Sequence, residues 1–134
     1  MNRREVMVAG VGVAALGALK QAEAAEASPR SALIASAFAC VQVGQACQQH
    51  CLTQLSSGDT SLAECAATIA AMLPSCEALA ALAVQNSLRL KALASVCAVI
   101  CRDCEKSCRK HEMHAICKQC ADACAACAAQ CDKV

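Results

Sequence analysis

The sequence predicts an all-α protein, an antiparallel up-down-up-down four-helix bundle. Three observations support this fold class. The 134-residue chain has the length of a single domain, its 14 cysteines and its one aromatic residue, Phe38, imply a core of small side chains, and short runs of turn formers separate long apolar segments. Small side chains let helices approach closely, and short connections make consecutive long helices antiparallel neighbours.

Residues 1–27 differ in composition from the rest of the chain and predict a cleaved signal peptide. Arg3 and Arg4 precede a Gly/Ala/Val-rich run over residues 6–19, which small residues follow. The run is shorter than the ~20 apolar residues that a bilayer requires, so we expect no stable membrane anchor. The arginine pair indicates the twin-arginine export route, although the two residues after it depart from the usual pattern. We expect cleavage between about residues 24 and 28 and export to the periplasm or an equivalent compartment.

Four helices are expected in the remaining domain, residues 28–134. The first ends at a run of turn formers, residues 56–60. Asp59, Thr60 or Ser61 is expected to cap the second helix, because Glu64 follows at the spacing of a capping box. The expected helices cover residues 31–55, about 61–84 with a kink at Pro74, 87–110 with a cap at Asn86 or Ser87, and 115–132.

The cysteines fall on one face of each predicted helix. A helix advances about 100° per residue, and the cysteines lie within arcs of about 40° in the first helix, about 60° in the third and about 80° in the fourth. Charged residues of the third and fourth helices fall on the opposite faces. Thiols are therefore expected to line the core. They are Cys40, Cys47, Cys51, Cys65, Cys76, Cys97, Cys101, Cys104, Cys108, Cys117, Cys120, Cys124, Cys127 and Cys131.

The register of an antiparallel hairpin provides a second test of this pattern, because facing positions have residue numbers with a constant sum. Cysteines of the third and fourth helices satisfy this condition four times, and those of the first and second helices twice. Met72 shares the stripe of the second helix. The predicted facing pairs are 108 with 117, 104 with 120, 101 with 124, 97 with 127, 51 with 65 and 40 with 76.

Such a core favours binding of a soft metal ion. Fourteen cysteines are too many to be explained as small buried hydrophobes, and thiols spaced along continuous helices are awkward to join as disulfides. Zinc needs closed sets of four ligands, into which these stripes do not obviously divide. Cu(I) is a soft ion that accepts two or three thiolates. The near-neutral balance of 12 basic and 11 acidic residues provides no patch for nucleic acid.

Charge balance sets the expected capacity. A dry core cannot hold many unpaired thiolates, so each thiolate needs about one positive charge. We therefore expect roughly one Cu(I) per core cysteine, on the order of a dozen or more ions per chain. No catalytic constellation accompanies the stripes, so we expect a store of multiple Cu(I) ions and not an enzyme. Two alternatives remain open, an iron-sulfur electron carrier of the ferredoxin type and a bundle stapled by disulfides.

The chain resembles the bacterial copper storage proteins, which are cysteine-lined four-helix bundles. The resemblance is carried by His50 and Cys51, by the CxxxCxxCxxxC run over residues 97–108 and by the CxxCxxxCxxCxxxC run over residues 117–131. It implies export, a homo-oligomer that is a tetramer in characterised members, and supply of Cu(I) to exported or membrane copper enzymes such as the membrane methane monooxygenase.

One end of the predicted bundle contains residues suited to receive copper. Exported relatives tend to carry methionines near this mouth, whereas this chain has Gln54, Ser57 and Leu62 there. The loops after the first and third helices lie at the same end of an up-down bundle. We therefore expect a site where copper enters, formed by His50, His111, Met113 and His114. The opposite end is expected to be sealed by Leu33, Ile34, Phe38, Leu79, Leu82, Leu90 and Leu93.

Overall fold

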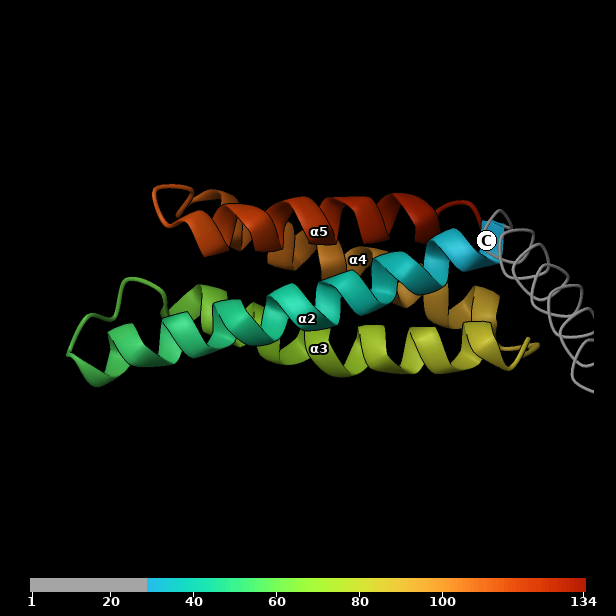
Figure 1. Cartoon of the computed structure of the whole chain (residues 1–134), viewed down its shortest axis with the longest axis horizontal. Coiled ribbons are helices and arrows are strands. Elements are labelled where there is room, and N and C mark those ends of the chain that lie inside the picture. The colour runs from blue at the N-terminus through green and yellow to red at the C-terminus, as the bar shows by residue number, and fades with distance from the viewer. Residues whose placement is uncertain (1–28) are drawn as a thin grey trace, which may run out of the picture. The chain divides into compact units, whose positions relative to one another are not determined.

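The computed structural model describes residues 29–134 and shows four helices and no strand in that range, which confirms the predicted fold class (Figure 1). The predicted signal peptide lies outside the described residues. Contacts divide the chain into residues 1–32 and residues 33–134, and the bundle is the second unit. The helices are α2 (Pro29–Ser56), α3 (Ala63–Val84), α4 (Leu90–Arg109) and α5 (Ala115–Cys131).

Each helix of the bundle contacts its neighbours in a square arrangement. α4 packs against both α3 and α5. α2 reaches α5 where the thiol of Cys40 donates to the carbonyl of Ala123 at 3.0 Å. α2 also lies so close to α3 at Gly44 that a Cβ atom there would come within 2.5 Å of the Met72 Cε atom. The α2–α3 and α4–α5 loops lie at the same end, as the up-down topology predicts (Figure 1).

The predicted cap of the second helix is wrong by about one residue. α3 begins at Ala63, and Leu62 occupies the N-cap position without a side-chain hydrogen bond. The predicted Asp59 instead closes a turn, since its Oδ1 atom accepts a hydrogen bond of 2.9 Å from the Ser61 backbone N–H. Leu62 is fully buried. Packing of this leucine in the core therefore decides where the helix begins, because burying a large aliphatic side chain is worth about 1.5–3 kcal/mol and a cap about 1 kcal/mol.

The connection between α3 and α4 is also longer than predicted. Asn86 adopts a left-handed conformation with φ of 54°, which asparagine tolerates better than most residues. The Oγ atom of Ser87 accepts a hydrogen bond of 3.1 Å from the Arg89 backbone N–H. Ser87 thus caps a turn, and the helix proper begins at Leu90.

The apolar end of the bundle matches the prediction except at Phe38. Leu33, Leu79 and Leu90 are buried, and Ile34, Leu82 and Leu93 pack against the core as half-buried side chains. Phe38 is 57% exposed and lines a surface pocket with Val41 and Val84. It lies two residues before Cys40, about 200° around the helix from the cysteine stripe, so it faces away from the core.

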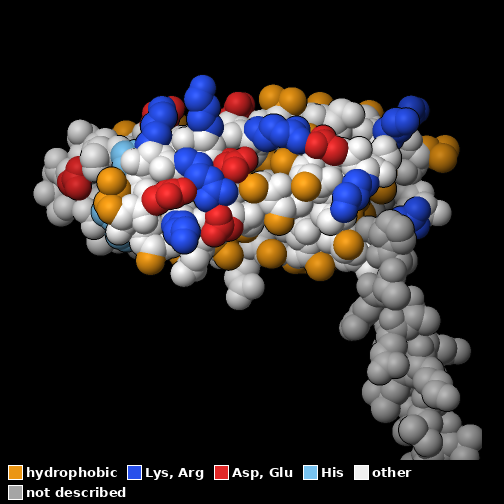
Figure 2. Space-filling model, turned by 90° about the horizontal axis from the view of Figure 1, so that it is seen from above, with side chains coloured by type: hydrophobic (Ala, Val, Ile, Leu, Met, Phe, Trp, Pro, Cys, Tyr) orange, Lys and Arg blue, Asp and Glu red, His pale blue; other side chains and the backbone are white. Residues whose placement is uncertain are grey.

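The outer surface carries interspersed charges of both signs (Figure 2). Arg109 forms ion pairs with Glu105 at 3.1 Å, Glu112 at 3.2 Å and Asp122 at 2.7 Å. Hydrogen bonds to these carboxylates, to Asp122 most strongly and then to Glu105, raise the pKa of Arg109. The network links α4, the following loop and α5 on the side away from the thiols.

α3 has the length and composition of a membrane-spanning helix. Its apolar window has a mean hydropathy of 1.7, and 39% of that window is buried in the bundle. Within residues 29–134 it is the one helix that meets this criterion. A core helix rich in Ala and Leu meets it too, and Cys65, Met72 and Cys76 of α3 are fully buried in the bundle.

Candidate metal centre

All fourteen cysteines are free thiols and all are buried. The thiols replace the aromatic and branched side chains of an ordinary core, and 13 of the 14 are 0% exposed, with Cys131 at 4%. The structure thus shows the predicted sulfur-lined interior. It contradicts the alternative of a bundle stapled by disulfides.

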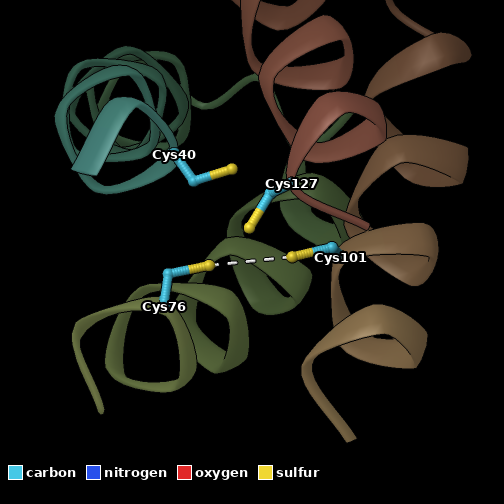
Figure 3. Close-up of side chains that lie close together, drawn as sticks. All are labelled: Cys40, Cys76, Cys101 and Cys127. Carbon is cyan, nitrogen blue, oxygen red and sulfur yellow. Dashed lines mark hydrogen bonds between the residues drawn. The ribbon is translucent and has the colours of Figure 1, made fainter. Parts of the chain in front are cut away.

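Four of the thiols, one from each helix, converge in a single group. These are Cys40 of α2, Cys76 of α3, Cys101 of α4 and Cys127 of α5, and their side chains point toward one another (Figure 3). Their sulfur atoms all lie within 4.8 Å of one another, and the Sγ atoms of Cys76 and Cys101 are 3.6 Å apart. The group joins all four helices at one level of the bundle.

Two groups of three sulfurs lie elsewhere in the core. Cys47, Cys65 and Cys108 form one, in which the Sγ atoms of Cys65 and Cys108 are 3.0 Å apart. The Cys47 thiol also approaches the Cys117 sulfur at 3.9 Å. The other group is Cys104, Cys120 and Cys124. Ten cysteines therefore occur in compact groups, and the remaining four extend the sulfur lining.

The groups include facing pairs that the register predicts and contacts that it does not. Two of the predicted pairs, 40 with 76 and 104 with 120, lie within 4.8 Å. Two close sulfur contacts join other helices: Cys65 with Cys108 and Cys76 with Cys101 link α3 to α4. The predicted facing pairs lie within the α2–α3 and α4–α5 hairpins, and these contacts lie within the third consecutive pair of helices, α3 and α4, for which no facing pairs were predicted.

Burial and hydrogen bonding act in opposite directions on the acidity of the thiols. Burial, with a contribution from charge on neighbouring sulfurs, raises the pKa of Cys97 and of Cys117 to about 12. A hydrogen bond with Cys124 is the largest cause that lowers the pKa of Cys101 to about 5. Hydrogen bonding from Cys108 lowers the pKa of Cys47 in the same way. A sulfur that accepts S–H bonds is the place where a proton is most easily displaced by a metal ion.

Ser107 is the one buried polar residue among the described residues, and the sequence reasoning missed it. Its hydroxyl donates to the Cys104 carbonyl at 3.1 Å and lies 2.5 Å from the Thr68 hydroxyl. The Thr68 hydroxyl also donates to the Cys65 carbonyl at 3.0 Å. Ser107 lies between two cysteines of the α4 stripe, and this position is the signal that would have indicated its burial.

The histidines gather at the end of the bundle where the α2–α3 and α4–α5 loops meet. The His50 Nε2 and His114 Nδ1 atoms are 3.0 Å apart, and the ring centroids are 4.9 Å apart. His111 is half-buried in the same loop, and its backbone N–H donates to the Cys108 carbonyl at 3.0 Å. Met113 is 77% exposed. The structure therefore brings His50 and His114 into contact and leaves Met113 largely in solvent.

The arrangement limits which ions the core can hold. The four-sulfur group has the ligand number of a structural zinc site, which the sequence reasoning did not anticipate. The other two groups have three sulfurs each, and the four further buried thiols extend the sulfur lining, so the cysteines do not divide into separate tetrahedral sets. Cu(I) fits such a lining because it binds two or three thiolates and shares sulfurs between ions.

Comparisons with known proteins agree with this geometry. The family model described as copper storage protein matches residues 26–134. A solved structure of a Cu(I)-bound copper storage protein, BsCsp3, aligns with a TM-score of 0.73 and 28% sequence identity, covering 79% of this chain and 97% of that chain. No curated protein gave a significant sequence match.

Proposed function

Because the chain belongs to the copper storage protein family, we propose that it binds multiple Cu(I) ions through the thiolates of its core and stores them for supply to exported or membrane copper enzymes. The single observation that carries this proposal is the set of fourteen buried, free thiols arranged in groups with sulfurs within 4.8 Å. The match to a Cu(I)-bound relative supports the choice of ion.

All fourteen cysteines are proposed as ligands, each bridging two Cu(I) ions. Every thiol must lose its proton when copper binds, so loading exchanges about one proton for each ion and leaves a nearly neutral core. This exchange avoids the large cost of unpaired charge in a dry interior. The capacity is then roughly one ion per cysteine, on the order of a dozen or more.

We propose a storage role for the protein, which the copper storage family supports. We also propose export through the twin-arginine signal over residues 1–27, and the start of the family match at residue 26 is compatible with cleavage between residues 24 and 28. Assembly into a homo-oligomer, a tetramer by resemblance, belongs to the same proposal.

Copper is proposed to enter at the end that carries His50, His111, Met113 and His114. The contact between His50 and His114 supports this, because it places two imidazoles beside the first core thiols. Joint replacement of His111, Met113 and His114 by alanine should slow Cu(I) uptake without lowering the final capacity. An uptake rate equal to that of the original chain would reject this site.

The experiment that tests the storage function is metal analysis combined with a thiol count on one anaerobic sample. We expect fourteen reactive thiols before loading and a colourless protein with many bound Cu(I) ions afterwards. The matched control is loading with Zn²⁺. Because the core has a single four-sulfur group, we expect about one Zn²⁺ ion to bind per chain at high affinity. A brown protein with visible absorption would instead indicate an iron-sulfur cluster and would overturn the proposal.

A further inference from the structure

The histidine end of the bundle has a ligand set different from that of the core. His50 and His114 present ring nitrogens 3.0 Å apart. Two cis ligands on one metal ion at about 2.0 Å each lie about 3 Å from one another, so the pair needs little movement to bind one ion. Asp59 lies near the same end of the bundle. A hydrogen bond from Ser61 lowers the pKa of Asp59, and the charges of His114 and His111 lower it further. Imidazole and carboxylate ligands suit Cu(II), whereas the thiolates of the core select Cu(I).

Cysteines follow both histidines of this site closely along the chain. Cys51 follows His50 in α2, and the backbone N–H of Cys117 donates to the His114 carbonyl at 3.0 Å. Burial, and then charge on neighbouring sulfurs including Cys65, raises the pKa of Cys51. Residues adjacent along the chain therefore connect the imidazole pair to the group of Cys47, Cys65 and Cys108.

Cys65 and Cys108 are the thiols best placed to supply electrons. Their Sγ atoms lie 3.0 Å apart, closer than those of Cys76 and Cys101 at 3.6 Å. A disulfide needs about 2.05 Å, so bond formation requires an approach of about 1 Å. His111 lies three residues after Cys108, and its backbone N–H donates to the Cys108 carbonyl. The pair is therefore close to the end at which the histidines gather.

We propose that the end of the bundle marked by His50 and His114 binds Cu(II) and that Cys65 and Cys108 reduce it, so that the protein converts Cu(II) into the Cu(I) that it stores. In this reaction, which each reduced chain performs once, two Cu(II) ions each gain one electron. The S–H bonds of Cys65 and Cys108 break, a sulfur–sulfur bond forms between them, and two protons leave to solvent. This activity rests on the proposed storage function at one point: the Cu(I) that is formed passes to the remaining thiolates, which store it.

The test uses the reduced, metal-free protein mixed anaerobically with two equivalents of Cu(II). We expect the electron paramagnetic resonance signal of Cu(II) to appear with nitrogen hyperfine structure and then to disappear. A Cu(I)-specific chelator should recover two Cu(I) ions, the thiol count should fall by two, and mass spectrometry should find the disulfide between Cys65 and Cys108. In the His50→Gln/His114→Gln variant the rate of signal loss should fall by about tenfold or more, because the ion is no longer held beside the thiols.

Matched controls separate this inference from general thiol oxidation. Gln49→Ala should retain the original rate, whereas Cys108→Ser should lose the specific disulfide. Cu(II) reduction at the original rate in the double histidine variant, or disulfides distributed over many cysteines, would overturn the inference. The same preparations are also titrated with Cu(I). Normal Cu(I) capacity without Cu(II) reduction rejects this activity alone, and failure to bind Cu(I) rejects the storage function.

Discussion

The Sγ atoms of Cys76 on α3 and Cys101 on α4 lie 3.6 Å apart, within a group that takes one sulfur from every helix (Figure 3). The two residues are not a facing pair within either predicted hairpin. Their contact means that a metal ion bound here joins both hairpins of the bundle. Copper loading and folding stability are therefore coupled.

Cu(I) loading should raise the melting temperature of the protein. An ion that binds only the folded state stabilises it by about 4 kcal/mol at a free concentration 1,000 times its dissociation constant, and several such ions act together. Thermal unfolding of anaerobic samples, followed by circular dichroism with and without Cu(I), measures the shift. Equal melting temperatures would show that copper does not bind in the core.

The metal-free protein should lose stability above about pH 9. The pKa values of Cys97 and Cys117 rise to about 12 from an ordinary value of 9.0, chiefly because the thiols are buried. Below pH 9 both the folded and the unfolded state keep these protons. Between pH 9 and pH 12 the unfolded state loses them while the folded state holds them, so the free energy of unfolding falls as pH rises.

Urea unfolding of the reduced protein at about pH 8 and about pH 11 measures this loss. Cys97→Ala is the control, because it removes one of the thiols whose pKa burial raises and should weaken the pH dependence. A free energy of unfolding that rises over this interval would contradict the assigned direction of the pKa shifts.

Enlarging Gly44 should destabilise the contact between α2 and α3. A Cβ atom there would lie 2.5 Å from the Met72 Cε atom and 2.9 Å from the Leu73 Cδ2 atom. Both are tips of side chains that can shift, and alanine improves helix propensity by about 1 kcal/mol, so Gly44→Ala should change stability by less than about 1 kcal/mol. Gly44→Leu should cost about 1–3 kcal/mol or more through overpacking.

Chemical denaturation of the metal-free variants provides the measurement. Gly44→Ala is the matched control for the larger substitution, since both gain helix propensity. If Gly44→Leu unfolds at the same denaturant concentration as the original protein, the two helices are not in close contact at this position.

The sequence predicted those features that depend on one helix at a time. The direction of each cysteine follows from the helical period, and the burial of all fourteen thiols confirms it. The same period explains the exposure of Phe38, two residues from Cys40, although the prediction had placed it in the seal. The contact of His50 with His114 follows from topology, because both loops lie at one end.

Some features that depend on packing between helices were not predicted. The contacts of Cys76 with Cys101 and of Cys65 with Cys108 join α3 to α4, a pairing that the registers of the α2–α3 and α4–α5 hairpins do not describe. The start of α3 was missed for a related reason. Burial of Leu62 outweighs the capping preference of the polar residues before it.

The number of Cu(I) ions bound per chain tests the central claim most directly. Reduced, metal-free protein is titrated with Cu(I) under anaerobic conditions against a competing chelator of known affinity. The sulfur-lined core predicts saturation at roughly one ion per cysteine, on the order of a dozen or more ions. Saturation at one to four ions would contradict it, because the core would then contain isolated metal sites and not a continuous copper store.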